Sequence, residues 1–171
     1  ELEADLLIVP ADKHTQHIIN ELEIPVLSVK DDFKAKPVKH IVMPIHDKPE
    51  TRQKIPVGAV IAKHFNAEVD LVVISGKSNE EQIRLKSYAN QAQNWVLERG
   101  VNCTYDFKIG GKVAEETINY AIEKDADMII IMNDRDLNFF SMQMSEKIIR
   151  NSPVPVMTVE PKDVAKGVAR L

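Results

Sequence analysis

The sequence predicts an α/β protein whose helices cover both faces of a doubly wound, five-stranded parallel sheet. Two observations lead to this prediction. Short apolar runs recur without polar alternation, and such runs are typical of strands that are buried on both faces. Amphipathic segments separate the runs, which gives the order βαβαβαβαβ from residue 41 onward. The clearest run is MIIIM, at residues 128–132.

Each element between residues 37 and 160 has its own signal. We expect strands at 41–45, 69–74, 101–108, 128–132 and 154–159. We expect helices at about 50–65, 79–99 and 114–124, and a shorter one after residue 138, because apolar residues recur there every three to four positions. The residues expected to face inward from the first three helices are Ile55, Ala59, Ala62 and Phe65; Leu85, Tyr88, Ala89, Ala92, Trp95 and Val96; and Ile118, Ala121 and Ile122.

Proline and glycine mark two of the helix ends. Pro56 should either kink its helix or lie in the first turn, because proline has no N–H to donate. Gly100 stands where a helix commonly ends with a glycine.

A repeat relates the two ends of the chain. Residues 4–9 match 126–131 at an offset of 122 residues, and residues 24–29 match 154–159 at an offset of 130. The later copy therefore has eight extra residues in its loop. The polar stretch 31–39 suggests a boundary, so we divide the chain into residues 1–36, 37–160 and a tail at 161–171. The start at Glu1, without a methionine, leads us to expect a fragment or a processed chain.

Composition narrows the class of protein. The net charge is −4 and the basic residues are scattered, which argues against a nucleic-acid partner. Cys103 is the single cysteine, which excludes an internal disulfide and a multi-cysteine metal site. No apolar run approaches the ~18 residues that span a bilayer, and no signal segment is seen. We expect a cytoplasmic protein without direct membrane contact.

Three stretches resemble the universal stress protein domain. They are the strand Ile41-Val42-Met43-Pro44 with the charged turn after it, the segment 110–132, and the closing SEKIIRNSPVPVMTV at 145–159. The resemblance implies strand order 3-2-1-4-5, as in adenine-nucleotide alpha-hydrolase-like folds. Residues 4–30 resemble the final third of a preceding domain of this family. The resemblance therefore implies a tandem protein whose first domain is truncated.

The resemblance also implies what the chain lacks. The ATP-binding branch of the family has an aspartate after its first strand and a loop of pattern G-x2-G-x9-G-S/T after its fourth. Here no glycine lies between Gly111 and Gly167, and Met142-Gln143 stands in place of the final Gly-Ser/Thr. Either His46 or Asp47 aligns with the aspartate.

The expected function is therefore a non-catalytic stress-response module that forms dimers and binds a partner or small ligand, with no cofactor. Two alternatives stay open. One is a stress protein that binds ATP or AMP through a degenerate loop. The other is the cytoplasmic regulatory domain of a membrane transporter.

A candidate ligand site follows from the predicted sheet. Ligands of doubly wound sheets bind beyond the carboxyl ends of the strands, where the winding reverses. The residues expected there are Pro44, Ile45, His46, Asp47, Met132, Asn133, Arg135 and Gln143. His46 and Asp47 are read either as an acid–base pair or as a turn in which Asp47 caps the helix. Asn133, Asp134, Arg135 and Asp136 are read as a polar ligand or metal loop, or as a solvated loop.

Three other features have weaker functional readings. His14 and His17 have the spacing of a ligand pair, but two histidines without a third ligand are too few for zinc. Cys103 is expected to be a small core residue. Phe139, Phe140, Met142 and Met144 form either a partner surface or the apolar face of the last helix.

The two repeated end strands are expected to pair. A sheet edge exposes unpaired N–H and C=O groups, so we expect 24–29 and 154–159 to pair antiparallel, within one chain or between two copies. The family resemblance implies self-association through the last strand. The proline in each segment should lie at the end of the pairing. The residues expected at this interface are Ile24, Val26, Val29, Val154, Val156 and Val159.

Overall fold

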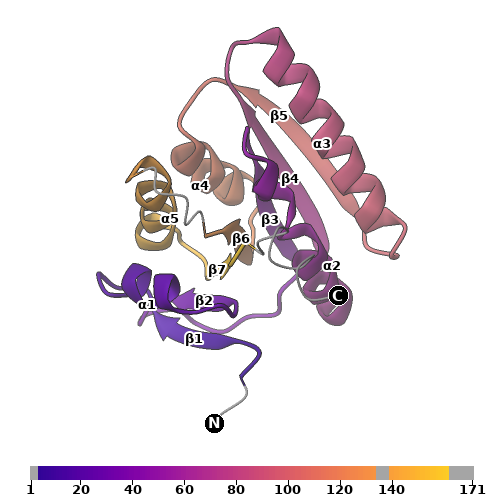
Figure 1. The fold of residues 1–171 in the computed structure, drawn as a ribbon. Helices are drawn as coiled ribbons and strands as arrows, with labels where there is room; N and C mark the ends of the chain where they lie inside the picture. The colour runs from indigo at the N-terminus through magenta and orange to yellow at the C-terminus, as the bar shows by residue number, and fades with distance from the viewer. Residues whose placement is uncertain (1–3, 134–138, 162–171) are drawn as a thin grey trace, which may run out of the picture.

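The computed structural model describes residues 4–133 and 139–161, and the side chains of residues 49 and 139–143 are left out of the description. One seven-stranded sheet has the order β1-β2-β7-β6-β3-β4-β5 (Figure 1). The strands are β1 Leu7–Pro10, β2 Val26–Val29, β3 His40–Ile45, β4 Glu68–Ser75, β5 Cys103–Ile109, β6 Met128–Met132 and β7 Val156–Val159. The helices are α1 Thr15–Glu21, the 3-10 helix η1 Pro49–Arg52, α2 Ile55–Phe65, α3 Asn79–Leu97, α4 Val113–Glu123 and α5 Phe139–Asn151.

The α/β architecture is confirmed, but the expected sheet of five strands is wrong. The strands of residues 37–160 do follow the order 3-2-1-4-5, all parallel. β1 and β2 extend this sheet to seven strands, and β2 runs antiparallel to β7, so the sheet is mixed. The physical reason is the unpaired edge that β7 would otherwise expose.

Helices cover both faces of the sheet, which explains the unbroken apolar runs. Along β3, Met43 and Ile45 pack in the core under α2 and α3, while Val42 packs in the core under α1, α4 and α5. Ile129, Ile130 and Ile131 of β6 are likewise fully buried on alternating faces. A strand with one wet face would need a polar residue at every second position.

Two residues expected to face inward are instead exposed. Phe65 is 47% exposed, because it is the last residue of α2 and Asn66 follows in a left-handed conformation that ends the helix. Ile122 is 60% exposed; the inward stripe of α4 runs through Thr117 and Tyr120 instead. Pro56 lies in the first turn of α2 and leaves the helix unbroken.

The β2–β7 pair joins the two ends of the chain within one molecule. Its register places Val26 opposite Thr158, Leu27 opposite Met157 and Ser28 opposite Val156. Each proline, at positions 25 and 155, directly precedes its strand, so neither removes a hydrogen bond from this pairing. Ile24 and Val154 also lie just outside the two strands.

Asp127 anchors the connection between residues 30 and 39 to the sheet. Its carboxylate accepts hydrogen bonds from the backbone N–H of Lys39 (2.7 Å) and of His40 (3.0 Å). The Lys36 ammonium lies 2.6 Å from the other oxygen. Burial acts to raise the pKa of Asp127, but the hydrogen bonds and the Lys36 charge outweigh it and lower this pKa.

We expect Asp127→Ala to destabilise the fold by about 2 kcal/mol at pH 7, because two partly buried hydrogen bonds to a charged acceptor are lost. The folded pKa is lowered, so this stability exists above the unfolded pKa and is lost as pH falls through the folded value. Urea unfolding at pH 7 and at acid pH measures both effects. Lys36→Met is the control and should cost under about 1 kcal/mol, because Lys36 is 43% exposed. An equal loss in both variants would contradict the account.

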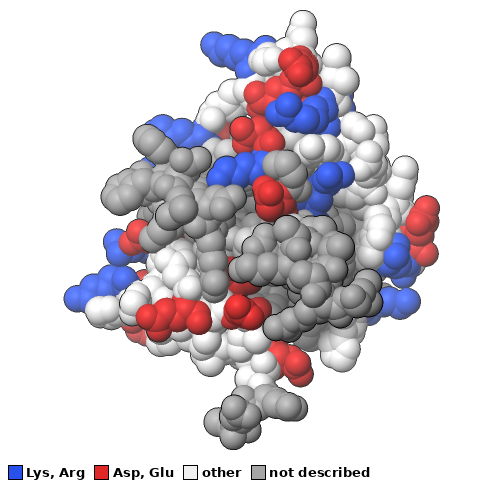
Figure 2. Space-filling model, viewed as in Figure 1, with Lys and Arg blue, Asp and Glu red and all other residues white. Residues whose placement is uncertain are grey.

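Charges of both signs are interspersed over the described residues of the face shown in Figure 2. This distribution agrees with the small net charge and the scattered basic residues. In the described part of the chain, no helix combines the length and the apolarity that a membrane crossing needs.

Candidate functional site

The candidate site lies where the winding of the sheet reverses, at the carboxyl ends of β3 and β6. β3 is followed by α2 and β4 on one side, and β6 by α5 and β7 on the other. Ile45 and Asn133 are fully buried there, and His46 and Met132 are nearly so. Pro44 is buried as well. The structure therefore brings together these five of the predicted site residues, but it buries them.

The short helix η1 explains this burial, because it packs against both β3 and β6. Thr51, the third residue of η1, is 1% exposed. Its hydroxyl donates to the Pro44 carbonyl at 3.4 Å and accepts the backbone N–H of His46 at 3.4 Å. The segment before α2 thus folds back over the end of β3.

Lys54 is a buried residue at this end of the sheet that sequence reasoning missed. It precedes α2 and is only 1% exposed. Its ammonium donates to the Thr51 carbonyl and, at 3.2 Å, to the Thr51 hydroxyl. Among the described residues, no carboxylate forms an ion pair with it. Burial lowers the pKa of Lys54 to about 7.

Asn133 is held by a cluster of polar side chains that reaches across to the N-terminal segment. Its amide donates to Asn20 (3.2 Å) and to Glu160, and its oxygen accepts from Gln16 at 3.2 Å. Gln16 also donates to Asn20 at 3.1 Å. Because these contacts use both ends of its amide, Asn133 connects α1, β6 and the end of β7.

His46 and Asp47 do not form the arrangement expected for a helix cap. The His46 ring nitrogen lies 3.5 Å from an Asp47 oxygen, and this contact lowers the pKa of Asp47. The Asp47 side chain is 63% exposed. No side chain caps η1 or α2, whose N-terminal flanking residues are Lys48 and Lys54. The capping reading of Asp47 is therefore wrong.

The structure describes no side-chain contacts for the two other predicted site residues, Arg135 and Gln143. Arg135, with Asp134 and Asp136, lies outside the described residues, and Gln143 belongs to α5 but its side chain is not described. The same limit applies to Phe139, Phe140 and Met142; Met144 packs against the core under α1, α4 and α5.

The structure confirms the predicted core position of Cys103 and shows the surroundings of His17. His17 pairs with Glu21 at 3.2 Å on the surface of α1. Within residues 4–133 and 139–161, no group of three or more His, Cys, Asp and Glu side chains has metal-binding geometry. Cys103 is 5% exposed, and burial raises the pKa of its thiol to about 12, so it is an unreactive core residue.

Comparisons with known proteins place this geometry in context. The model of the universal stress protein family matches residues 37–160. A solved universal stress protein from Archaeoglobus fulgidus DSM 4304 is similar over 93% of this chain and 62% of its own, with 14% identity and a TM-score of 0.74. This chain therefore spans less than two thirds of that protein. The comparison with curated proteins gives no match.

Two further solved structures are similar to this chain over different shares of their own length. A protein of unknown function from Pseudomonas aeruginosa is similar over 96% of this chain and 66% of its own (15% identity, TM-score 0.67). An Archaeoglobus fulgidus universal stress protein in complex with dAMP is similar over 74% of this chain and 100% of its own (18% identity, TM-score 0.58). At these identities the likeness establishes the fold alone.

Proposed function

Because the chain belongs to the universal stress protein family, we propose that it is a non-catalytic stress-response module that acts through assembly and through partner or small-ligand binding. One observation carries the proposal: the end of the sheet where ligands of this fold class bind is filled by the protein's own groups. Thr51 and Lys54 are 1% exposed there, and Asn133 is fully buried.

The sequence of the loop after β6 also supports the proposal that the standard ATP site of the family is missing. A phosphate-binding loop needs glycines, because a Cβ would block the close approach of backbone N–H groups to the phosphates. Residues 133–143 contain no glycine. A triphosphate would therefore meet buried side chains among the described residues at the end of β3, and a loop sequence without the glycine pattern of the family.

We expect no heat of binding when ATP or AMP is titrated into the chain at about millimolar concentration, with or without magnesium. Isothermal calorimetry makes the measurement. A dissociation constant in the micromolar range would overturn the proposal.

The second candidate function is nucleotide binding through a different set of groups. Lys54 favours it, because a buried ammonium without a carboxylate partner among the described residues is a natural partner for phosphate. The related Archaeoglobus fulgidus protein was solved with dAMP, which shows that this fold can hold an adenine nucleotide. The same calorimetry on Lys54→Met separates this candidate from the first, since only here would the substitution abolish binding.

We further infer that residues 1–36 are the end of a first universal stress protein-like domain and its linker, that 37–160 form a complete second domain, and that 161–171 form a tail. Strand register supports the repeat. Leu7 pairs with Val26, and their counterparts Ile129 and Val156 pair in the same way. The hydrogen bond from Ala11 N–H to the Val29 carbonyl (2.8 Å) recurs from Asn133 to Val159 (2.7 Å).

The β2–β7 pair supports the same inference through its symmetry. Leu27 faces Met157, and these two residues are counterparts at the repeat offset of 130. The pairing is therefore centred on an approximate two-fold axis between the two copies, as an isologous interface requires.

The exposure of the Ile8 side chain in β1 also supports a first unit that is larger than residues 1–36. Ile8 is 63% exposed, whereas its counterpart Ile130 is fully buried between β3 and β7. The extent of the structural matches agrees with this inference. The longer neighbour is similar over 93% of this chain and 62% of its own, whereas the dAMP-bound one is similar over 74% of this chain and 100% of its own. Self-association through the last strand would then require exchange of residues 1–36 between copies, since β2 already pairs with β7.

A further inference from the structure

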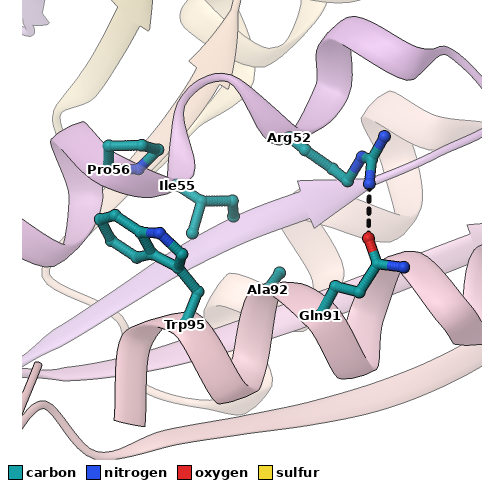
Figure 3. A pocket seen from close by; sticks show the side chains of 6 residues that line it. All are labelled: Arg52, Ile55, Pro56, Gln91, Ala92 and Trp95. Atoms are coloured by element: carbon teal, nitrogen blue, oxygen red, sulfur yellow. Dashed lines mark hydrogen bonds between the residues drawn. The ribbon is translucent and has the colours of Figure 1, made fainter. Parts of the chain in front are cut away.

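A small pocket lies between the start of α2 and the C-terminal half of α3, and its volume is about 220 Å³ (Figure 3). The residues that line it are Arg52, Ile55, Pro56, Gln91, Ala92 and Trp95. Figure 3 shows that Pro56 and Trp95 lie at one end, Arg52 and Gln91 lie at the other, and Ile55 points between them. The lining residues are thus apolar at one end and polar at the other, and the Arg99 guanidinium covers one face of the Trp95 ring at 3.2 Å from its centroid.

The apolar end is suited to a flat ring. Trp95 is partly buried and presents its indole toward Pro56 and Ile55, and Ala92 leaves room because its side chain is a single methyl group. Aromatic rings bind favourably against indole and proline surfaces. A dry cavity of roughly 150 Å³ is already large enough for benzene, so this pocket accommodates one substituted ring.

The polar end carries a positive charge that is held in place by neutral groups. The Arg52 guanidinium donates to Gln91 Oε1 at 2.7 Å and lies 3.9 Å above the Tyr88 ring. Gln91 in turn donates to Ser87 at 3.2 Å, which fixes the orientation of its amide. Among the described residues, no carboxylate is paired with Arg52. The guanidinium has five N–H donors, so most of them stay available to an anion.

We propose that this pocket binds a small aromatic carboxylate, with its ring between Pro56 and Trp95 and its carboxylate on Arg52. The site is separate from the buried end of β3 and does not depend on whether a nucleotide binds there. η1 carries both Arg52 of the pocket and Thr51 of the buried end. For a ligand of this size we expect a dissociation constant on the order of 1 mM.

Trp95 provides a direct probe, because it is the only tryptophan in the chain. The experiment titrates the full chain with 3-phenylpropionate while Trp95 emission is recorded, and repeats it with 3-phenylpropan-1-ol and with acetate. We expect a saturable change in Trp95 emission with 3-phenylpropionate. The neutral alcohol should bind about tenfold more weakly, because it cannot form the charged hydrogen bond to Arg52. Acetate should cause no change, because it has no ring to bind beside Trp95. Equal affinity for acid and alcohol, or no saturable change with the acid, would overturn the proposal.

Two variants test the roles of the two ends. Arg52→Met should weaken 3-phenylpropionate about tenfold and leave the alcohol unaffected, because only the acid contacts the guanidinium. Ala92→Leu should fill the apolar end and abolish binding of both probes. Arg84→Met, at an exposed position of α3, is the matched control and should change nothing. If Arg52→Met bound the acid as well as the unmodified chain does, the assignment of the carboxylate to Arg52 would be wrong.

Discussion

Replacement of Ile19 by alanine is expected to destabilise the whole chain by about 3 kcal/mol, although Ile19 belongs to the N-terminal segment. Ile19 lies in α1 and is 1% exposed. It packs in one core with Val26 of β2, Val156 of β7 and Ile148 of α5. The substitution removes three carbons from this core and leaves a cavity that residues from both ends of the sequence line.

The expected effect is global because β2 and β7 share one sheet. A loss of about 3 kcal/mol should lower the melting temperature by about 6–12 °C for a chain of this size. Trp95 reports on the far side of the sheet, since α3 packs against the opposite face from α1. Thermal unfolding followed by Trp95 emission therefore tests whether residues 4–36 unfold together with the rest.

Ile8→Ala is the matched control for this experiment. Ile8 lies in β1, in the same segment, but it is 63% exposed, so its replacement should change stability by no more than about 0.5 kcal/mol. If Ile19→Ala left the Trp95 transition unmoved, the N-terminal segment would be an independent unit, and its place in the common core would carry no stability for residues 37–160.

The strands were predictable from sequence because their environment leaves a strong composition signal. β6 is buried on both faces, and its five residues are all apolar. The two repeated ends predicted the antiparallel pair of β2 and β7, because edge strands need partners. The size of the sheet was not predictable in the same way. A local pattern indicates that a segment is a strand, but it does not indicate how many segments join one sheet.

The interior of the candidate site was much less predictable. A lysine in a polar stretch is normally exposed, and the burial of Lys54 depends on η1 turning back onto β3 and β6. The one signal was Pro56, which places the helix start near residue 55 and leaves residues 49–54 free for another conformation. Asn133 was predicted as a ligand residue, but its bonds to Gln16 and Asn20 come from a segment over 110 residues away.

Replacement of Lys54 by methionine is expected to stabilise the fold at pH 7 by about 2 kcal/mol. An unfolded lysine has a pKa of 10.5, whereas burial lowers the pKa of Lys54 to about 7. This difference corresponds to an ionisation cost on the order of 4–5 kcal/mol at pH 7 and below. Loss of the two hydrogen bonds to Thr51 offsets part of the gain, because each contributes about 1 kcal/mol.

The dependence of stability on pH tests whether the ionisation of Lys54 causes the expected gain. Between about pH 7 and 10.5 the unfolded chain binds one more proton at Lys54 than the folded chain does. Stability should therefore rise with pH across this window by up to about 1.4 kcal/mol per unit, and stay level below pH 7 as far as Lys54 is concerned. Methionine cannot titrate, so the variant should lose this part of the pH dependence. Its advantage of about 2 kcal/mol should disappear at about pH 9, and at pH 10 the variant should be slightly less stable than the unmodified chain, because the two hydrogen bonds are still missing.

Urea unfolding at pH 7 and pH 10, with Trp95 emission as the signal, measures both quantities. Lys63→Met is the matched control, because Lys63 lies in α2, the helix that Lys54 precedes, but is exposed. Its replacement should leave the pH dependence unchanged. A loss of several kcal/mol in Lys54→Met at both pH values would mean that the ammonium stabilises the fold. A gain at pH 7 that becomes a small loss at pH 10 would show that the cost of burying the ammonium outweighs its hydrogen bonds at neutral pH.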